Sequence, residues 1–163
     1  MRLAFIDLVY SWPPLGGAPL DLHHTVLGLQ RLGHDVNLFF ATDPERWDRG
    51  ELQPGTMPVP ATRLDFTEKQ YTPEHLPRAF REAVDKWKPD VVFICFGFFI
   101  KPYVAEAFAD YPTVSRYYAY EPACPRDYRI YKNAAICPQN SLLTPDVCRN
   151  STLDHLSESH RSR

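Results

Sequence analysis

Gly16 and Gly17 stand side by side in a loop rich in proline and glycine that runs from Ser11 to Pro19. Because glycine lacks a Cβ, the backbone here can come close to a ligand and can adopt positive φ. An apolar run precedes the loop and a helical pattern follows it, so unpaired N–H groups and the positive end of a helix dipole should meet at this point. That combination favours a phosphate group. The loop lacks the dinucleotide-binding pattern GxGxxG, and a tight turn without a ligand is the alternative interpretation.

Aromatic and imidazole side chains form two further candidate groups. Tyrosines can stack on the rings of a ligand and offer a hydroxyl group, which suits a binding groove, while core or rim packing is the alternative. The tyrosines in question are Tyr117, Tyr118, Tyr120, Tyr128 and Tyr131, of which we assign Tyr118 and Tyr120 to the groove. His23 and His24 are adjacent on an expected helix, so at most one of them faces the glycine loop, and solvated or capping roles suffice for both.

The elements around the glycine loop form a strand–helix–strand unit. The apolar run 2–9, broken only by Asp7, predicts a strand that is covered on both faces. Apolar residues at helical spacing predict a helix over 20–32, ended by Gly33 in the left-handed conformation. A second apolar run predicts a strand over 35–41. Parallel strands joined by a helix are connected with a right-handed crossover.

Later segments continue this alternation. We expect helices over 74–88 and 102–110, strands over 91–96 and 113–118, and one short strand at 57–59 or 63–66. After residue 121 the pattern weakens: 126–137 is interpreted as a short helix or a hairpin, and 145 onward as helical. The whole predicts an α/β fold, a Rossmann-like, doubly wound and mostly parallel sheet with helices on both faces. We expect one domain over 1–150 and a polar tail over 151–163 that starts a linker or a helix.

Composition limits the classes of partner. The chain has 163 residues, with 18 Lys and Arg against 20 Asp and Glu, so its net charge of −2 gives no basic field for nucleic acid. No apolar run approaches the length of a membrane-spanning helix, and no signal peptide is visible. We therefore expect a cytoplasmic protein whose four cysteines are free thiols.

Several short motifs, in order, resemble a known family. The run Pro13-Pro14-Leu15-Gly16-Gly17-Ala18, a helix and then Leu32-Gly33-His34-Asp35-Val36 resemble the opening of family 4 glycosyltransferases of GT-B fold. Pro89-Asp90-Val91-Val92 resembles their strand entry, and Pro112-Thr113-Val114 resembles the strand leading to their catalytic corner. The resemblance covers about residues 1–150, as the N-terminal half of a GT-B enzyme.

The resemblance implies roles for individual residues. Gly16 and Gly17 would face the diphosphate of a nucleotide-sugar donor, and Glu121 falls near the acidic position of the catalytic corner. Tyr118 and Tyr120, at the same corner, would line the groove for the sugar acceptor. Tyr120 stands where many relatives carry histidine, so Glu121 either orients an acceptor hydroxyl or acts as base, with an ordinary surface ion pair as the alternative. Some relatives carry a cysteine-rich stretch here, of which Cys137 and Cys148 remain while Ser151 replaces the last cysteine. Structural thiols rather than a zinc site are therefore expected. The resemblance implies no metal and no cofactor, and the sequence has no Asp-x-Asp pair.

The resemblance also implies a reaction that one domain cannot complete. Such enzymes move a sugar from a nucleotide donor to an acceptor hydroxyl, and their second domain supplies most donor contacts. We expect no such domain within the 163 residues and negligible activity without it, because one wall cannot align two substrates. The partner would be a separate donor-binding domain or subunit. A non-catalytic α/β module that binds a phosphate-bearing ligand is the main alternative. A short-chain dehydrogenase, suggested by Ser115, Tyr128 and Lys132, is the weakest interpretation.

Overall fold

The computed structural model describes residues 1–42, 50–51, 53–97, 100–119, 124, 131–132, 135–139 and 143–151. The chain divides into two compact units, Met1–Arg116 and Tyr117–Arg163, and each is described by itself. The expected domain limits, 1–150 and 151–163, stay a prediction.

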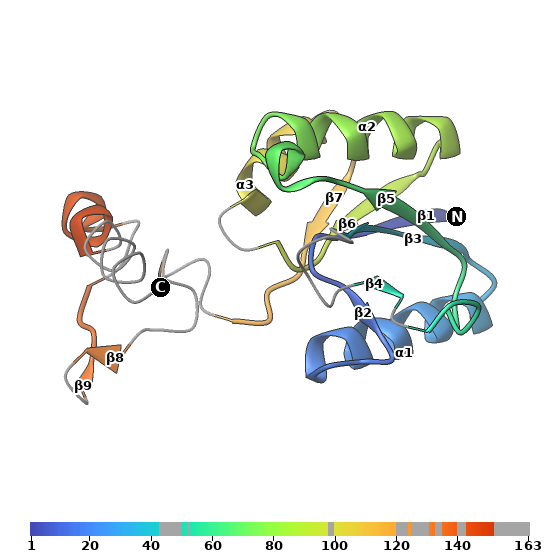
Figure 1. The fold of residues 1–163 in the computed structure, drawn as a ribbon, viewed down its shortest axis with the longest axis horizontal. Coiled ribbons are helices and arrows are strands. Elements are labelled where there is room, and N and C mark those ends of the chain that lie inside the picture. The colour runs from blue at the N-terminus through green and yellow to red at the C-terminus, as the bar shows by residue number, and fades with distance from the viewer. Residues whose placement is uncertain are drawn as a thin grey trace. The chain divides into compact units, whose positions relative to one another are not determined.

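The first unit is built on a five-stranded sheet in which every neighbouring pair is parallel (Figure 1). The strand order is β5-β3-β1-β6-β7, so the first strand lies in the centre and later strands add outward on either side. This is the doubly wound order, and it confirms the predicted α/β, Rossmann-like fold. The strands are β1 (Arg2–Asp7), β3 (Asp35–Thr42), β5 (Ala61–Asp65), β6 (Val91–Ile94) and β7 (Thr113–Ser115).

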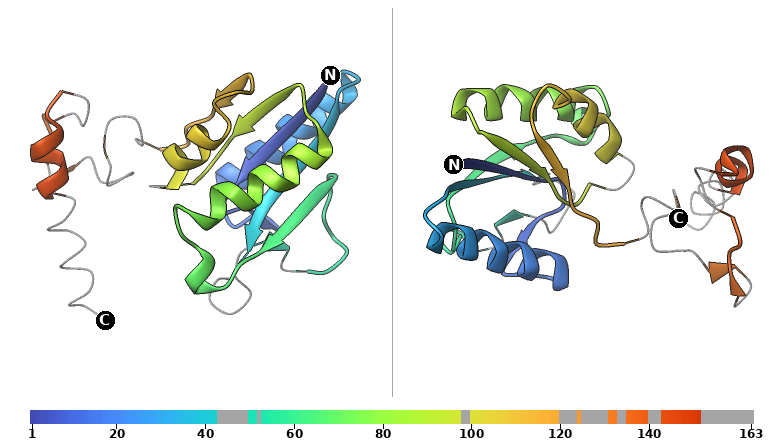
Figure 2. Two further views of the ribbon diagram at one scale, coloured as in Figure 1. Left: turned by 90° about the horizontal axis from the view of Figure 1, so that it is seen from above. Right: turned by 180° about the vertical axis from the view of Figure 1, so that it is seen from behind.

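Helices cover both faces of this sheet. Helix α1 (Gly17–Arg31) lies on one face, whereas α2 (His75–Trp87) and α3 (Lys101–Ala107) lie together on the other (Figures 1 and 2). The side chains of β1 alternate between the faces. Ala4 and Ile6 join the core under α2 and α3. Phe5 stacks on Phe93 of β6, with ring centroids 4.4 Å apart.

Helix α2 follows the expected amphipathic pattern. Leu76, Phe80 and Val84, spaced four residues apart, are all 0% exposed, as a helix with one buried stripe requires. The helix ends at Lys88, which adopts the left-handed conformation with φ 56°.

Arg81 joins the outer surfaces of α2 and α3. Its Nε lies 2.8 Å from each oxygen of Asp85, and its two Nη atoms lie 2.5 and 2.8 Å from the oxygens of Asp110. Nη1 also donates to the Ala107 carbonyl at 2.9 Å, at the end of α3. The guanidinium lies 4.9 Å from the Tyr111 ring centroid, and the Tyr111 hydroxyl donates to Asp85. The two helices are therefore held together by a polar network outside the apolar core.

Smaller elements agree with the predictions in part. Helix α1 begins at Gly17, three residues before the predicted start, and Gly33 has the expected positive φ of 84°. Of the two alternatives for the short strand, β5 matches 63–66, and 57–59 is not a strand. Three further elements are β2 (Ser11–Trp12), which pairs with β4 (Gly50–Glu51), and the 3₁₀ helix η1 (Glu68–Gln70).

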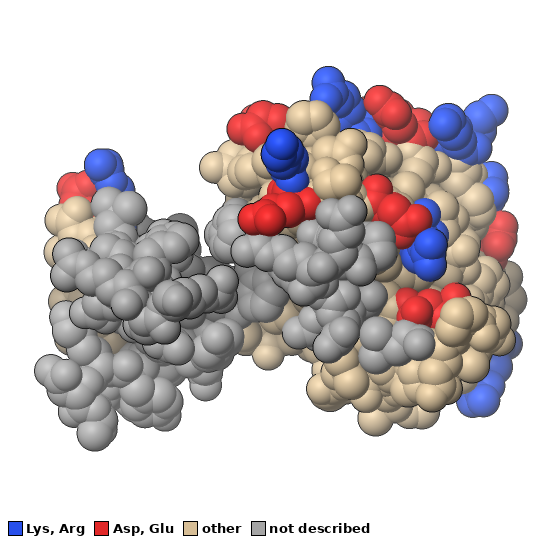
Figure 3. Space-filling view, viewed as in Figure 1, with Lys and Arg blue, Asp and Glu red and all other residues tan. Residues whose placement is uncertain are grey.

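In the second unit, β8 (Tyr131–Lys132) and β9 (Ala135–Ile136) pair antiparallel, so the described residues of the predicted segment 126–137 follow the hairpin alternative and not the helix. Residues 145–151 are helical, as predicted. No helix in the described ranges has the length and apolarity that crossing a membrane requires. On the visible face of the first unit, Lys and Arg lie interspersed with Asp and Glu among the described residues (Figure 3).

Candidate functional site

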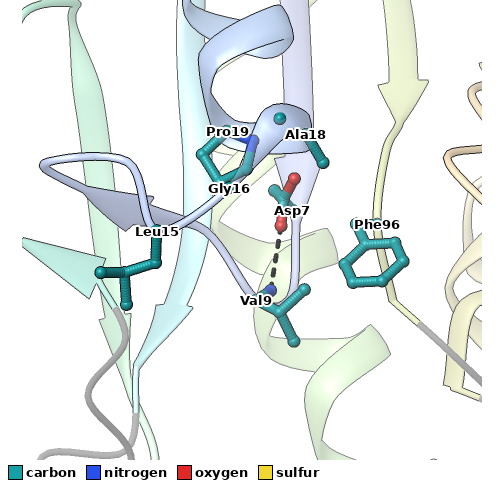
Figure 4. A pocket seen from close by; sticks show the side chains of 8 residues that line it. Asp7, Val9, Leu15, Gly16, Ala18, Pro19 and Phe96 are labelled. Carbon is teal, nitrogen blue, oxygen red and sulfur yellow. Dashed lines mark hydrogen bonds between the residues drawn. The ribbon is translucent and has the colours of Figure 1, made fainter.

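A pocket of about 190 Å³ opens where β1 and β6 end and α1 begins (Figure 4). This is the point at which the strand order reverses, with β3 and β5 added on one side of β1 and β6 and β7 on the other. In an open α/β sheet, the crossovers leave to opposite faces there, and the carboxyl ends of the strands border a crevice. The lining residues are Asp7, Val9, Leu15, Gly16, Gly17, Ala18, Pro19 and Phe96.

Main-chain pairing continues past the ends of both strands and fixes the floor of this pocket. The Cys95 N–H donates to the Ile6 carbonyl at 2.8 Å, and the Leu8 N–H donates to the Phe96 carbonyl at 2.8 Å. Consequently Asp7 and Phe96, which both line the pocket, stand on adjacent, rigidly paired backbones.

Gly16 and Gly17 form the rim of the pocket at the start of α1. Gly16 is the N-cap residue, its φ of 174° is ordinary extended backbone, and it has no side chain that could cap the helix. Both glycines are exposed, and a Cβ added to either would meet nothing within 4 Å. By contrast, a Cβ on Gly97 would lie 2.8 Å from Leu8 Cδ1. A side chain at 97 would therefore force the Leu8 side chain to move, whereas a Cβ at either position of the pair would displace no atom.

The loop before the glycine pair is anchored from the side. The Gly50 N–H donates to the Tyr10 carbonyl at 2.7 Å, next to the pairing of β2 with β4. The Leu15 N–H donates to the Ser11 hydroxyl at 3.3 Å. Tyr10 is 1% exposed, and burial, followed by the negative charge of Asp7, raises the pKa of its hydroxyl. The loop that carries the glycines is thus held by one backbone hydrogen bond and by one bond to a serine side chain.

Asp7 is a site residue that the sequence analysis did not identify. In the sequence Asp7 interrupts an apolar strand, and in the structure its side chain lines the pocket while only 2% of the residue is exposed. One carboxylate oxygen accepts the Val9 N–H at 2.9 Å, and Figure 4 shows the carboxylate directed toward the start of α1. The available signal was a charged residue inside an otherwise apolar strand, directly before a glycine-rich loop.

Basic and acidic side chains tie α1 to the end of β7 beside this pocket. Arg116, which follows β7, places Nη2 2.5 Å from Asp21 Oδ2 and donates through Nη1 to the Thr25 hydroxyl at 2.9 Å. Lys101 is 4% exposed, and its ammonium donates to the Arg116 carbonyl. Cys95 is buried among these charges, and burial, followed by the charge of Asp7, raises the pKa of its thiol. The carboxyl edge of β1, β6 and β7 is therefore a polar, charge-balanced region.

The two histidines of α1 lie outside the pocket lining. The His23 ring packs against Trp12, with centroids 4.6 Å apart, and against His24 at 5.2 Å. Burial, followed by the neighbouring His24, lowers the pKa of His23. The divergence expected of adjacent helical residues is present, since His23 is half-buried and His24 is exposed.

The remaining predicted residues belong to the second unit. Tyr118 is half-buried there, whereas Tyr120 and Glu121 lie outside the described residues. Cys137 and Cys148 are free thiols. No group of three or more His, Cys, Asp or Glu that could hold a metal ion occurs among the residues that the structure describes. The structure thus brings together Gly16, Gly17 and Asp7, and leaves the roles of Glu121 and the two tyrosines as predictions.

Comparison with known proteins agrees with this architecture. A model of the glycosyl transferase 4-like domain matches residues 16–115, more than half of the chain, from the glycine pair to the last residue of β7. No curated protein and no solved structure matches the chain. The match confirms the predicted resemblance to the N-terminal domain of a GT-B, family 4-like glycosyltransferase. The chain belongs to the glycosyl transferase 4-like domain family.

Proposed function

We propose that this domain is the acceptor-side wall of a glycosyltransferase that moves a sugar from a nucleotide-sugar donor to an acceptor hydroxyl. Gly16 and Gly17 face the donor's diphosphate. The observation that carries this assignment is the start of α1. It borders the pocket, its N-cap residue is a glycine, and a Cβ on Gly16 or Gly17 would meet no atom within 4 Å, so packing within this chain does not require glycine there. A backbone surface kept clear of side chains allows close approach by a ligand from outside this chain.

Electrostatics favour a diphosphate at this rim. The first N–H groups of a helix have no intrahelical partner, and the helix dipole places partial positive charge beside them. The interaction of one helix terminus with an anion is worth only about 0.3–2 kcal/mol. A single helix start therefore gives weak binding, and we infer that productive binding needs a second, donor-binding domain or subunit. Without that domain, the chain should have negligible transfer activity, because neither substrate is aligned or shielded from water.

The residues after β7 receive the other roles. We assign Glu121 to orienting or deprotonating the acceptor hydroxyl, and Tyr118 and Tyr120 to the acceptor groove. Tyrosine combines a flat apolar ring with a hydroxyl group, which suits sugars and polyols. We further assign the protein to the cytoplasm, which the four free thiols support, because reducing compartments keep thiols unpaired.

Binding at the rim can be tested on the full chain by ¹H–¹⁵N NMR. Inorganic pyrophosphate and uridine diphosphate should shift the amide signals of Gly16, Gly17 and Ala18, whereas uridine should not. Gly17→Val should abolish these shifts without unfolding the protein, since a Cβ at this exposed position meets no neighbour within 4 Å. Gly28→Val is the matched control, because Gly28 lies on the same helix with equally open surroundings. Equal binding by both variants would remove the assignment of Gly17.

Transfer must be measured on the protein in which this domain occurs with its donor-binding half. A panel of nucleotide sugars should include one donor that is transferred or slowly hydrolysed, and Gly17→Val should slow that reaction. Pyrophosphate binding without transfer or hydrolysis of any donor would instead favour a non-catalytic module for a phosphate-bearing ligand.

A further inference from the structure

We propose that the interior of the pocket behind Gly16 and Gly17 binds an uncharged, hydroxyl-bearing group of the acceptor, and that the Asp7 carboxylate accepts the hydrogen bond from its hydroxyl. This inference rests on the proposed function and names the class of acceptor group: a neutral alcohol or polyol with an apolar body, and not an anion. Three features of the pocket carry it.

The polar groups at the pocket are of two opposite kinds. Asp7 contributes a carboxylate, which accepts hydrogen bonds, and the start of α1 contributes N–H groups, which donate them. A hydroxyl group both donates and accepts, so it can be satisfied by a carboxylate and an N–H together. An ammonium group matches only the carboxylate, whereas a phosphate matches only the amides and is repelled by Asp7. The alcohol is therefore the group that fits both.

Burial makes this selection strong. Asp7 is 2% exposed, so its charge is little screened by water and acts in a medium of low effective dielectric. The carboxylate already accepts the Val9 N–H at 2.9 Å, and Figure 4 shows it directed toward the start of α1. A second negative charge inside the pocket would be repelled by the Asp7 carboxylate. Gly16 and Gly17, which are exposed at the rim, leave the donor's diphosphate outside it.

Most other lining side chains are apolar. Val9, Leu15 and Phe96 form walls beside Asp7, together with Ala18 and Pro19 at the start of α1 (Figure 4). The volume of about 190 Å³ is several times the share of one water molecule. An apolar wall with a few convergent polar groups is the composition of sites for small organic ligands. The hydroxyl therefore arrives on a carbon skeleton that covers Val9, Leu15 and Phe96.

The probe for this site is hexyl glucoside, a neutral polyol with an apolar tail, and the reference probe is inorganic pyrophosphate. NMR titration of the full chain should show saturable shifts of the Val9, Gly16 and Phe96 amides with the glucoside. Asp7→Asn should weaken glucoside binding about tenfold, because a hydrogen bond to a charged acceptor becomes one to a neutral acceptor. Asparagine keeps an oxygen for the Val9 N–H, so the fold should persist. In the same variant, pyrophosphate binding at the rim should stay equal or become tighter.

Asp35→Asn is the control for the change in charge. Asp35 is the first residue of β3 and so lies at the amino ends of the strands, away from the pocket; its side chain is 64% exposed and lies 3.2 Å from Arg2. This variant should bind the glucoside like the wild type. The proposal is overturned if the glucoside gives no saturable shifts at the pocket, or if Asp7→Asn binds it as well as the wild type. It is also overturned if removing the charge of Asp7 weakens pyrophosphate binding. If the wild type binds the glucoside but not pyrophosphate, that result would instead contradict only the assignment of Gly16 and Gly17 to the diphosphate.

Discussion

Replacing Gly50 by alanine should loosen the loop that carries the glycine pair. Gly50 has a φ of 86°, and a Cβ built on it would lie 2.2 Å from Thr42 Cγ2 and 3.2 Å from Phe40 Cε2. Thr42 and Phe40 are buried residues of β3. The Gly50 N–H also donates to the Tyr10 carbonyl, just before the loop. Glycine is thus needed at this position both for its backbone conformation and for the close approach of β4 to β3.

The two requirements have separable free energies. A non-glycine residue in the left-handed region costs about 1–2 kcal/mol, and forcing a methyl group into a packed contact costs about 1–3 kcal/mol more. Gly55 is the matched control, with a φ of 77° and nothing within 4 Å of an added Cβ. Gly55→Ala should therefore lose only the conformational part. Gly50→Ala should be less stable than Gly55→Ala by the packing part, about 1–3 kcal/mol.

Urea unfolding followed by tryptophan fluorescence would measure both variants. Thermal midpoints should differ by roughly 2–4 °C for each kcal/mol in a chain of this size. The NMR signals of Gly16 and Gly17 should shift in Gly50→Ala and stay unchanged in Gly55→Ala. Equal losses of stability in the two variants would show that Thr42 gives way without cost, and would refute the packing argument.

Two other perturbations test the fold. Arg81→Met should lower the free energy of unfolding by about 1–2 kcal/mol, because the hydrogen bond to the Ala107 carbonyl and the ring contacts are lost; the urea midpoint would measure this. Arg78 is an exposed residue of the same helix, so Arg78→Met should lower the midpoint less. Equal losses of stability in the two variants would argue against the network. His23→Gln should make folding less sensitive to acid. The pKa of His23 is lower in the folded protein than its ordinary value of 6.5, so the unfolded chain takes up a proton first as the pH falls. The wild type therefore loses stability between pH 6.5 and the lowered folded pKa. Parallel stability–pH curves for His23→Gln and the wild type, from urea midpoints on both sides of pH 6.5, would contradict this assignment.

The fold could be predicted from the sequence because the relevant information is local. The apolar runs at β1 and β3, the four-residue spacing in α2 and the left-handed Gly33 are each set by neighbours along the chain. The order of these elements then leaves few topologies, since crossovers between parallel strands are right-handed. The position of Gly16 and Gly17 beside a pocket followed from the same rule about strand ends.

The contacts that could not be predicted from the sequence join residues that are far apart along the chain. The bond between Arg116 and Asp21 spans 95 residues, and the approach of Gly50 to Thr42 depends on a loop path that no periodicity reveals. Asp7 was missed because a charge in an apolar strand looks like a defect until the start of α1 is placed beside it. The early start of α1 arose because Gly17 and Ala18 precede Pro19, and proline is well tolerated in a first turn.

The central place of β1 has a consequence for synthesis on the ribosome. Leu3 to Tyr10 are all buried in the finished domain, yet β1 pairs with β3, which starts at residue 35, and with β6, which starts at residue 91. At translation rates of roughly 5–20 residues per second, the β6 side of this strand stays uncovered for roughly 5–20 s. An apolar strand with an unpaired edge is prone to aggregate until its neighbour pairs with it. Substitutions that weaken β6 should therefore lower the yield of folded protein in cells more than they lower its stability once folded, and chaperones that shield nascent chains should restore that yield.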